Sequence, residues 1–107
     1  MRADLVSDIE ERLGSTLAEE RGVPEVSRFH GIVVAIYYND HAPPHFHARY
    51  ESYEITVGIM DGVVVGRFPR RALGLVVEWY TLHQTELLEN WNRARERQPL
   101  IRIEPLE

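Results

Sequence analysis

Residues 45–60, HFHARYESYEITVGIM, decide the fold, because they predict two adjacent β-strands joined at Glu51-Ser52. On both sides of this dipeptide, apolar and polar side chains alternate with the period of a strand. A two-residue turn at this point predicts four cross-strand pairs: Phe46–Val57, His47–Thr56, Ala48–Ile55 and Arg49–Glu54. This register is favoured because it sorts the apolar residues together and brings the opposite charges of Arg49 and Glu54 side by side.

The two faces of this hairpin differ in chemistry. The face expected to cover the core is apolar and carries Phe46, Ala48, Tyr50, Tyr53, Ile55 and Val57. The opposite face is polar and carries His45, His47, Arg49, Glu54 and Thr56. His45 and His47 are therefore expected to lie next to each other, and Pro43 and Pro44 stiffen the backbone that leads into them.

The segments on either side of the hairpin extend the predicted sheet. Residues 29–38 are apolar on both alternations, which is typical of a central strand that is covered on both faces. Asp61-Gly62 is the strongest hairpin signal in the chain, and it predicts a third strand running to about Phe68. Residues 100–103 could add a short edge strand that ends before Pro105.

A long amphipathic helix is predicted from Pro69, because proline suits the first turn of a helix. Its apolar stripe, with a restart expected near Thr85, consists of Ala72, Leu73, Val76, Trp79, Tyr80, His83, Leu87 and Trp91. In this stripe His83 is interpreted as a partly buried core residue. The arginines at positions 93, 95 and 97 are interpreted as a solvated helix end, where positive charge is favourable.

The expected fold class is α+β. A three- to four-stranded, mostly antiparallel sheet packs one face against the long helix of the C-terminal half, and a short amphipathic helix is expected over residues 3–13. Residues 18–27 are interpreted as a linker because they combine charge with Gly22 and Pro24. The expected division is therefore an N-terminal helix and linker over residues 1–25 and one α+β domain over residues 26–107.

Composition limits the classes of function. The 107 residues carry a formal net charge of −5, which argues against a general nucleic-acid binder. The sequence contains no cysteine, so disulfides, thiolate metal sites and cysteine nucleophiles are excluded. No signal peptide and no membrane-spanning stretch is recognisable, and a cytoplasmic protein without membrane contact is the expectation.

Three segments of the chain resemble a bacterial family catalogued as domain of unknown function 4160. They are SRFHGIVVAIYYNDHAPPHFHARY, GRFPRRALGLVVEWYTLHQTELLENW and IRIEPL, and the resemblance covers roughly residues 26–106. It implies a component of a two-gene system of the toxin–antitoxin kind, with a cognate partner protein. A weaker similarity of layout links the chain to HicA-type mRNA interferase toxins, which use a histidine early in the second strand of their fold, and it implies that His45 or His47 takes this place here.

The histidines support two chemical hypotheses. In the first, the protein is a metal-independent endoribonuclease without a cofactor, in which His45 and His47 transfer protons and Arg49 stabilises the phosphorane. Its RNA substrate would be held by Arg67, Arg70 and Arg71 at the start of the long helix. In the second, His45 and His47 bind a divalent metal such as zinc, with His41 or Asp40 as a further ligand.

A third hypothesis belongs to another class, a binding or regulatory module without catalysis. Trp79, Tyr80 and Trp91 exceed the needs of a small core, and any of them left exposed would indicate an interface with a partner protein or a second copy in a homodimer. The plainest interpretation remains that histidines beside prolines stack on aromatic rings or bond to carbonyl groups, with no chemistry at all.

Overall fold

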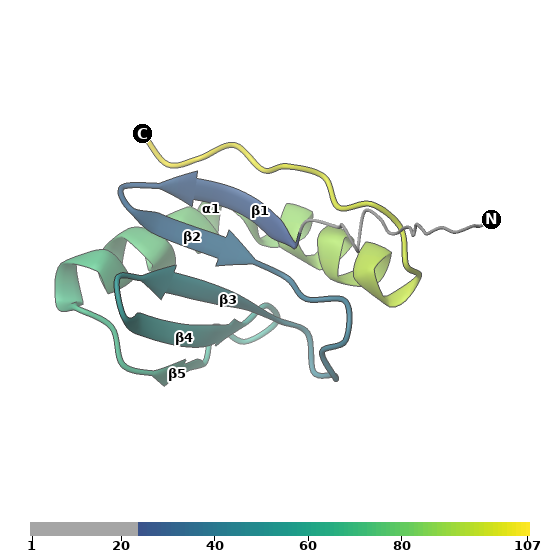
Figure 1. The fold of residues 1–107 in the computed structure, drawn as a ribbon, viewed down its shortest axis with the longest axis horizontal. Helices are drawn as coiled ribbons and strands as arrows, with labels where there is room; N and C mark the ends of the chain where they lie inside the picture. The colour runs from purple at the N-terminus through teal and green to yellow at the C-terminus, as the bar shows by residue number, and fades with distance from the viewer. Residues whose placement is uncertain (1–23) are drawn as a thin grey trace.

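The computed structural model describes residues 24–107, which form one antiparallel sheet and one long helix (Figure 1). The elements follow in the order β1 (Glu25–Phe29), β2 (Ile32–Ala35), β3 (His45–Tyr50), β4 (Tyr53–Gly58), β5 (Val64–Gly66) and α1 (Arg70–Arg95). Each strand pairs with the next along the chain, so the sheet order is β1-β2-β3-β4-β5. The α+β class is confirmed, with five strands where three or four were expected. The helix predicted over residues 3–13 lies outside the described residues.

The β3–β4 hairpin has the predicted register. Phe46 pairs with Val57, His47 with Thr56, Ala48 with Ile55 and Arg49 with Glu54. Glu51 opens the turn with a φ of 54°, an uncommon conformation for a residue with a side chain. The predicted apolar face is buried, except at the hairpin end, where Tyr50 is partly buried and Tyr53 is 41% exposed.

The first hairpin corrects two expectations. The strand predicted over residues 29–38 is present and lies between β1 and β3, but its bounds are wrong, because the chain reverses at His30-Gly31 and β2 spans only Ile32–Ala35. Both turn residues have positive φ, 51° and 79°, as a tight hairpin turn requires. The linker interpretation is wrong for residues 25–27, which belong to β1. Val26 and Phe29 are buried, but the neighbouring charges of Glu25 and Arg28 make the composition of this segment resemble that of a linker.

The hairpin at Asp61-Gly62 is confirmed, but its turn is wider than two residues. β4 ends at Gly58, whose N–H donates to the carbonyl of Val63 over 2.9 Å, and β5 begins at Val64. β5 ends at Gly66 rather than near Phe68. Gly66 has a φ of 114°, and this conformation, which favours glycine, turns the chain towards the helix.

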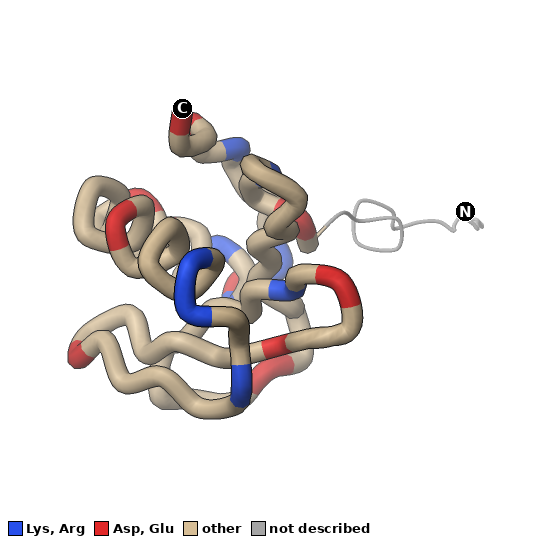
Figure 2. The backbone as a smooth tube through the Cα atoms, turned by 90° about the vertical axis from the view of Figure 1, so that its left-hand side faces the viewer, with Lys and Arg blue, Asp and Glu red and all other residues tan. Residues whose placement is uncertain are grey.

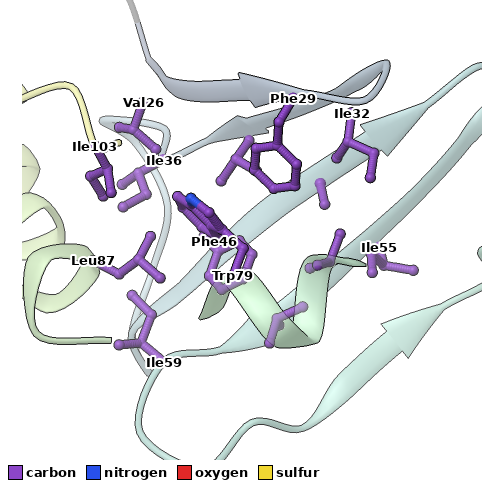
Figure 3. Close-up of a cluster of buried hydrophobic side chains, with 14 of the residues drawn as sticks. Val26, Phe29, Ile32, Ile36, Phe46, Ile55, Ile59, Trp79, Leu87 and Ile103 are labelled. Carbon is purple, nitrogen blue, oxygen red and sulfur yellow. The ribbon is translucent and has the colours of Figure 1, made fainter. Parts of the chain in front are cut away.

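The helix α1 covers one face of the sheet, and the core lies between them (Figure 3). Its stripe is buried as predicted, at Ala72, Val76, Trp79, Leu87 and Trp91. Because both tryptophans are buried, they do not mark an interface. His83 is partly buried as expected, and its non-helical φ of −127° interrupts the helix close to the predicted restart.

The C-terminal segment runs back beside β1 and α1 (Figure 1), and the edge strand predicted over residues 100–103 is wrong. The N–H of Ile103 donates to the carbonyl of Val26 over 2.8 Å. The buried side-chain amide of Asn90 donates to the carbonyl of Ile101 over 2.7 Å and accepts from its N–H over 2.8 Å. These are the two hydrogen bonds that a neighbouring strand would otherwise provide. The indole N–H of Trp79 donates to the carbonyl of Glu104. Side chains of α1 therefore form hydrogen bonds with the backbone groups of this segment. Such contacts leave no strand-like alternation in the sequence.

Candidate functional site

Three segments meet at one end of the sheet, where β2 and β4 end and β3 begins. They are the loop of residues 36–44, the first residues of β3, and the last turns of α1. The loop is fastened at its start by the N–H of Ile36, which donates to the carbonyl of Pro24 over 2.9 Å. At its end the N–H of Ile59 donates to the carbonyl of Pro44 over 3.0 Å. Backbone hydrogen bonds therefore hold both ends of this loop, which leads directly into His45.

Asp40 and the two strand histidines form a compact group at this end. Oδ2 of Asp40 lies 2.9 Å from Nε2 of His47 and 3.3 Å from Nε2 of His45. The two imidazole rings are 5.3 Å apart between centroids. One ligand atom from each of the three residues lies within 4.8 Å of the other two. In residues 24–107 this is the only group of three such side chains that could hold a metal ion.

The other nitrogen of each ring also has a partner. Nδ1 of His45 lies 2.9 Å from the carbonyl oxygen of Pro43, and Nδ1 of His47 lies 3.1 Å from Oε2 of Glu54. A carbonyl and a carboxylate can only accept a hydrogen bond, so both Nδ1 atoms must carry the proton. In the neutral ring the lone pair is then on Nε2, and in both histidines this atom lies close to Oδ2 of Asp40, with hydrogen-bond geometry only for His47. A protonated ring would instead donate from Nε2 to this carboxylate.

Aromatic rings enclose the group. The ring of Tyr37 lies 4.6 Å from that of His47, and the indole of Trp91 lies 5.2 Å from the ring of His45. As a result the side chains of Asp40, His45 and His47 are 23%, 21% and 17% exposed. This partial shielding lowers the local dielectric while leaving a route from solvent.

Arg95 connects the end of α1 to the loop. Its guanidinium lies 4.6 Å from the centre of the Trp91 ring, donates to the carbonyl of Tyr38 over 2.8 Å and donates to the carbonyl of Asp40. Arg95 is exposed in the last turn of α1, as expected for a solvated helix end, and it also binds the loop. Its partners lie more than fifty positions earlier in the chain, so no local pattern could have revealed them.

The remaining predicted residues lie at different places. Arg49 is exposed on the same strand face as His47 and lies across from Glu54. His41 is exposed and lies outside the group that Asp40 forms with the strand histidines.

The predicted substrate-binding arginines lie at the opposite end of the sheet. Arg71 and Pro69 line a hollow together with Tyr50, the last residue of β3, whereas the histidine pair is at the start of that strand. Figure 2 looks towards this end and shows basic segments where the chain enters α1. Arg67, Arg70 and Arg71 are all exposed, and among residues 24–107 none of them forms an ion pair. The structure therefore does not bring these arginines to the histidines.

Sequence reasoning missed Glu54 as a partner of His47, although the signal was present. The predicted register puts Glu54 two residues from Thr56, the cross-strand neighbour of His47, and on the same polar face. A diagonal pair of this kind is within reach of long side chains. The role of Glu54 could therefore have been read from the hairpin itself.

Charge also holds β1 at this end of the sheet. Glu25 accepts from the guanidinium of Arg28 over 2.9 Å and from that of Arg102 over 3.1 Å. The hydrogen bond from Arg28, helped by Arg102, lowers the pKa of the Glu25 carboxyl against the opposing effect of burial.

Near the β4–β5 turn, burial raises the pKa of the Tyr80 phenol, with a further contribution from Asp61.

Comparison with known families gives one match. The model of the family described as "Domain of unknown function (DUF4160)" matches residues 31–92, which include the loop, both strand histidines and most of α1. No curated protein and no solved structure matches the chain, and the similarity of layout to HicA-type toxins stays a prediction. Within the described part of the chain, no helix has the length and apolar character needed to span a membrane.

Proposed function

Because this chain belongs to the DUF4160 family, whose description assigns no activity, its function has to be argued from the site, and we propose that Asp40, His45 and His47 bind one divalent metal ion. The observation that carries the proposal is the convergence of three lone pairs. With both Nδ1 atoms donating, Nε2 of each histidine and Oδ2 of Asp40 present electron pairs to one small space. Without a proton on either Nε2 such an arrangement is repulsive, and a metal ion at this place would bind all three electron pairs.

The spacing of the ligand atoms also supports a metal. In a tetrahedral site, metal–ligand bonds of about 2.0–2.2 Å hold neighbouring ligand atoms about 3.3–3.6 Å apart. The distance of 3.3 Å between Oδ2 of Asp40 and Nε2 of His45 fits this spacing, whereas the distance of 2.9 Å to Nε2 of His47 would have to lengthen by about 0.4 Å.

The partners of the Nδ1 atoms fit the same function. Histidine ligands usually donate their second N–H to a carboxylate or a backbone carbonyl, which fixes the tautomer and makes the ligating nitrogen more basic. Glu54 supplies the carboxylate for His47, and Pro43 supplies the carbonyl for His45. Arg95 contributes by holding the backbone of Asp40.

The ligand set selects a class of metal. Two imidazoles and one carboxylate suit Zn²⁺ and the other late first-row divalent ions, and they suit Mg²⁺ and Ca²⁺ poorly. Three protein ligands leave coordination positions open, as in catalytic rather than structural zinc sites. A metal ion held in this way would act as a Lewis acid towards a bound water or substrate oxygen.

The ribonuclease hypothesis has less support from the same geometry. A histidine that transfers a proton needs a ring nitrogen that can meet the substrate. All four ring nitrogens of His45 and His47 already face acceptor groups of the protein. Arg49 lies on the same strand face, but the arginines at the start of α1 are at the other end of the sheet. We therefore rank a metal-independent ribonuclease second, and RNA cleavage by protein freed of metal with EDTA would reverse this ranking.

The proposal of a two-gene system with a partner protein is independent of the metal. It rests on the resemblance to the family. The exposed Val77 and Leu82 of α1 are five positions apart and do not form the contiguous apolar patch that marks an interface. Light scattering of the protein alone and after co-expression with the product of the adjacent gene would test it, and an unchanged mass would count against it.

Elemental analysis of protein purified without a histidine tag tests the metal proposal. We expect close to one equivalent of zinc or a related metal per chain, and its loss in His47→Ala and in the nearly isosteric Asp40→Asn. His41→Ala is the matched control, because it removes a histidine from the same loop but outside the group, and it should keep the metal. Circular dichroism checks that each variant is folded. Metal-free wild type that also fails to take up added Zn²⁺ or Co²⁺ would overturn the proposal.

A further inference from the structure

A hollow of about 300 Å³ adjoins the histidine group on the face of the sheet that α1 does not cover. His45 belongs to both, since it lines the hollow and faces Asp40 with its Nε2. Thr56, the cross-strand neighbour of His47, lines the floor. A molecule lying in the hollow would therefore touch a proposed ligand of the metal at one end.

The walls of this hollow are mainly apolar. Pro43 and Pro44 form one side, and Met60, Val63 and Val65 come from the β4–β5 hairpin on the other. The latter three are 62%, 55% and 63% exposed. The face of β3 and β4 around Arg49 and Glu54 is polar, so these exposed apolar side chains lie beside the histidine group and not next to that polar surface.

Asp61 is the acidic residue in the lining, and its carboxylate is used by the turn between β4 and β5. Oδ1 of Asp61 accepts from the N–H of Val63 over 3.0 Å and so stabilises the turn. A Cβ on Gly58 would come within 2.2 Å of this same oxygen, which shows how closely the turn folds over the end of β4. The Asp61 side chain thus stabilises the turn that forms one wall of the hollow, and it is not interpreted as a cation ligand.

We infer that the hollow binds the apolar body of a small molecule whose acidic head group coordinates the metal. This inference rests on the proposed metal site for the head group and on the hollow for the body. The volume is at the lower limit of small-molecule pockets, about 300–1,000 Å³, and it fits a short aliphatic or single-ring group. Of the three proposed ligands only His45 lines the hollow, so the anionic end of the molecule would reach the metal beside His45 while the apolar end lies against the wall.

Hydroxamates of different chain length provide the test, because they share one metal-binding head. The protein is loaded with Co²⁺, and acetohydroxamate and hexanohydroxamate are titrated while the visible cobalt spectrum is followed. Each methylene that is fully buried strengthens binding by up to about fourfold. In this half-open hollow we expect hexanohydroxamate to bind wild type at least tenfold more tightly than acetohydroxamate.

Two valine variants locate the effect. Val65→Asp puts a charge into the wall and should bring the ratio of the two affinities close to one, without changing the affinity for acetohydroxamate. Val77→Asp is the matched control, since it places the same change on an exposed valine of α1, and it should keep the wild-type ratio.

The outcomes separate the two proposals. If both hydroxamates change the cobalt spectrum of wild type with equal affinity, the metal site stands and the apolar subsite is overturned. The subsite is also overturned if Val65→Asp and Val77→Asp behave alike. If wild type takes up no Co²⁺, the metal proposal fails, and the inference fails with it.

Discussion

The two ends of the sheet both carry clusters of ionisable side chains, and they hold them differently. At the end where β3 begins, the rings of His45 and His47 have a partner for every nitrogen, drawn from Asp40, Glu54 and a backbone carbonyl. At the end where α1 begins, Arg70 and Arg71 are exposed, and no described carboxylate pairs with them. Both clusters are equally visible in the sequence, as HAPPHFH and RFPRR.

This difference shows what makes a cluster a site. At the arginine end, the residues are neighbours only because they are consecutive in the chain. At the histidine end, residues from a loop, two strands and the end of a helix converge, and the ordering costs conformational entropy that a solvated surface would avoid. We therefore expect substitutions at the histidine end to change metal binding and stability, and matched substitutions elsewhere to have little effect.

Among variants that keep all three proposed ligands, the largest effect is expected from Glu54→Ala. Removing the partner of a histidine ligand typically weakens metal binding by about 10–100-fold. The carboxylate of Glu54 is 46% exposed, so a value near the lower limit is expected. Competition titration of Zn²⁺ against a chromophoric chelator measures the change.

Two further variants sharpen this test. Glu54→Gln keeps an acceptor for Nδ1 of His47 and should recover part of the affinity. Glu51→Ala removes the other acid of the same hairpin, outside the group, and should leave the affinity unchanged. Equal losses in Glu51→Ala and Glu54→Ala would mean that general negative charge, and not the contact with His47, supports the metal.

The parts of the fold that were predicted correctly are those decided by neighbours within a hairpin. The β3–β4 register followed from the alternation of apolar residues and from the charges of Arg49 and Glu54, and the structure has the same pairs. The stripe of α1 followed from its period. By contrast, β1 was missed because its charged residues resemble those of a linker, and its turn at His30-Gly31 depends on backbone angles that histidine seldom adopts.

The candidate site could be predicted only in part for a related reason. The alternation of side chains along β3 is enough to bring His45 and His47 together. The choice of Asp40 over His41 as their neighbour depends on the path of the loop, which Arg95 holds from the far end of α1. Contacts between residues so distant in sequence leave no trace in any periodic pattern.

A smaller effect, on stability, is expected from Arg95→Ala. This change removes two hydrogen bonds to backbone carbonyls and the contact with Trp91. We expect the free energy of unfolding to fall by about 1–2 kcal/mol, as for the loss of a few partly exposed charged contacts. Urea denaturation followed by tryptophan fluorescence measures it.

The control for this variant is Arg70→Ala at the other end of the sheet. A positive charge in the first turn of a helix is slightly unfavourable, so its removal should change stability by no more than about 0.5 kcal/mol. A cost in Arg70→Ala as large as that in Arg95→Ala would remove the distinction between the two ends.

The smallest effect is expected from Glu25→Gln, and it should depend on pH. The pKa of Glu25 is lowered in the folded protein by its hydrogen bond from Arg28, with help from Arg102, so the ionised carboxylate stabilises the fold. This contribution is complete above the pKa of an unfolded glutamate, about 4.3, and is lost as the pH falls through the lowered pKa of the folded state. Wild type should therefore be slightly more stable than Glu25→Gln at pH 7 in urea denaturation, and the two should converge as the pH falls below the lowered pKa of the folded state. A difference that stays constant from pH 7 to pH 3 would instead assign the effect of the substitution to lost hydrogen bonding, independent of the charge on Glu25.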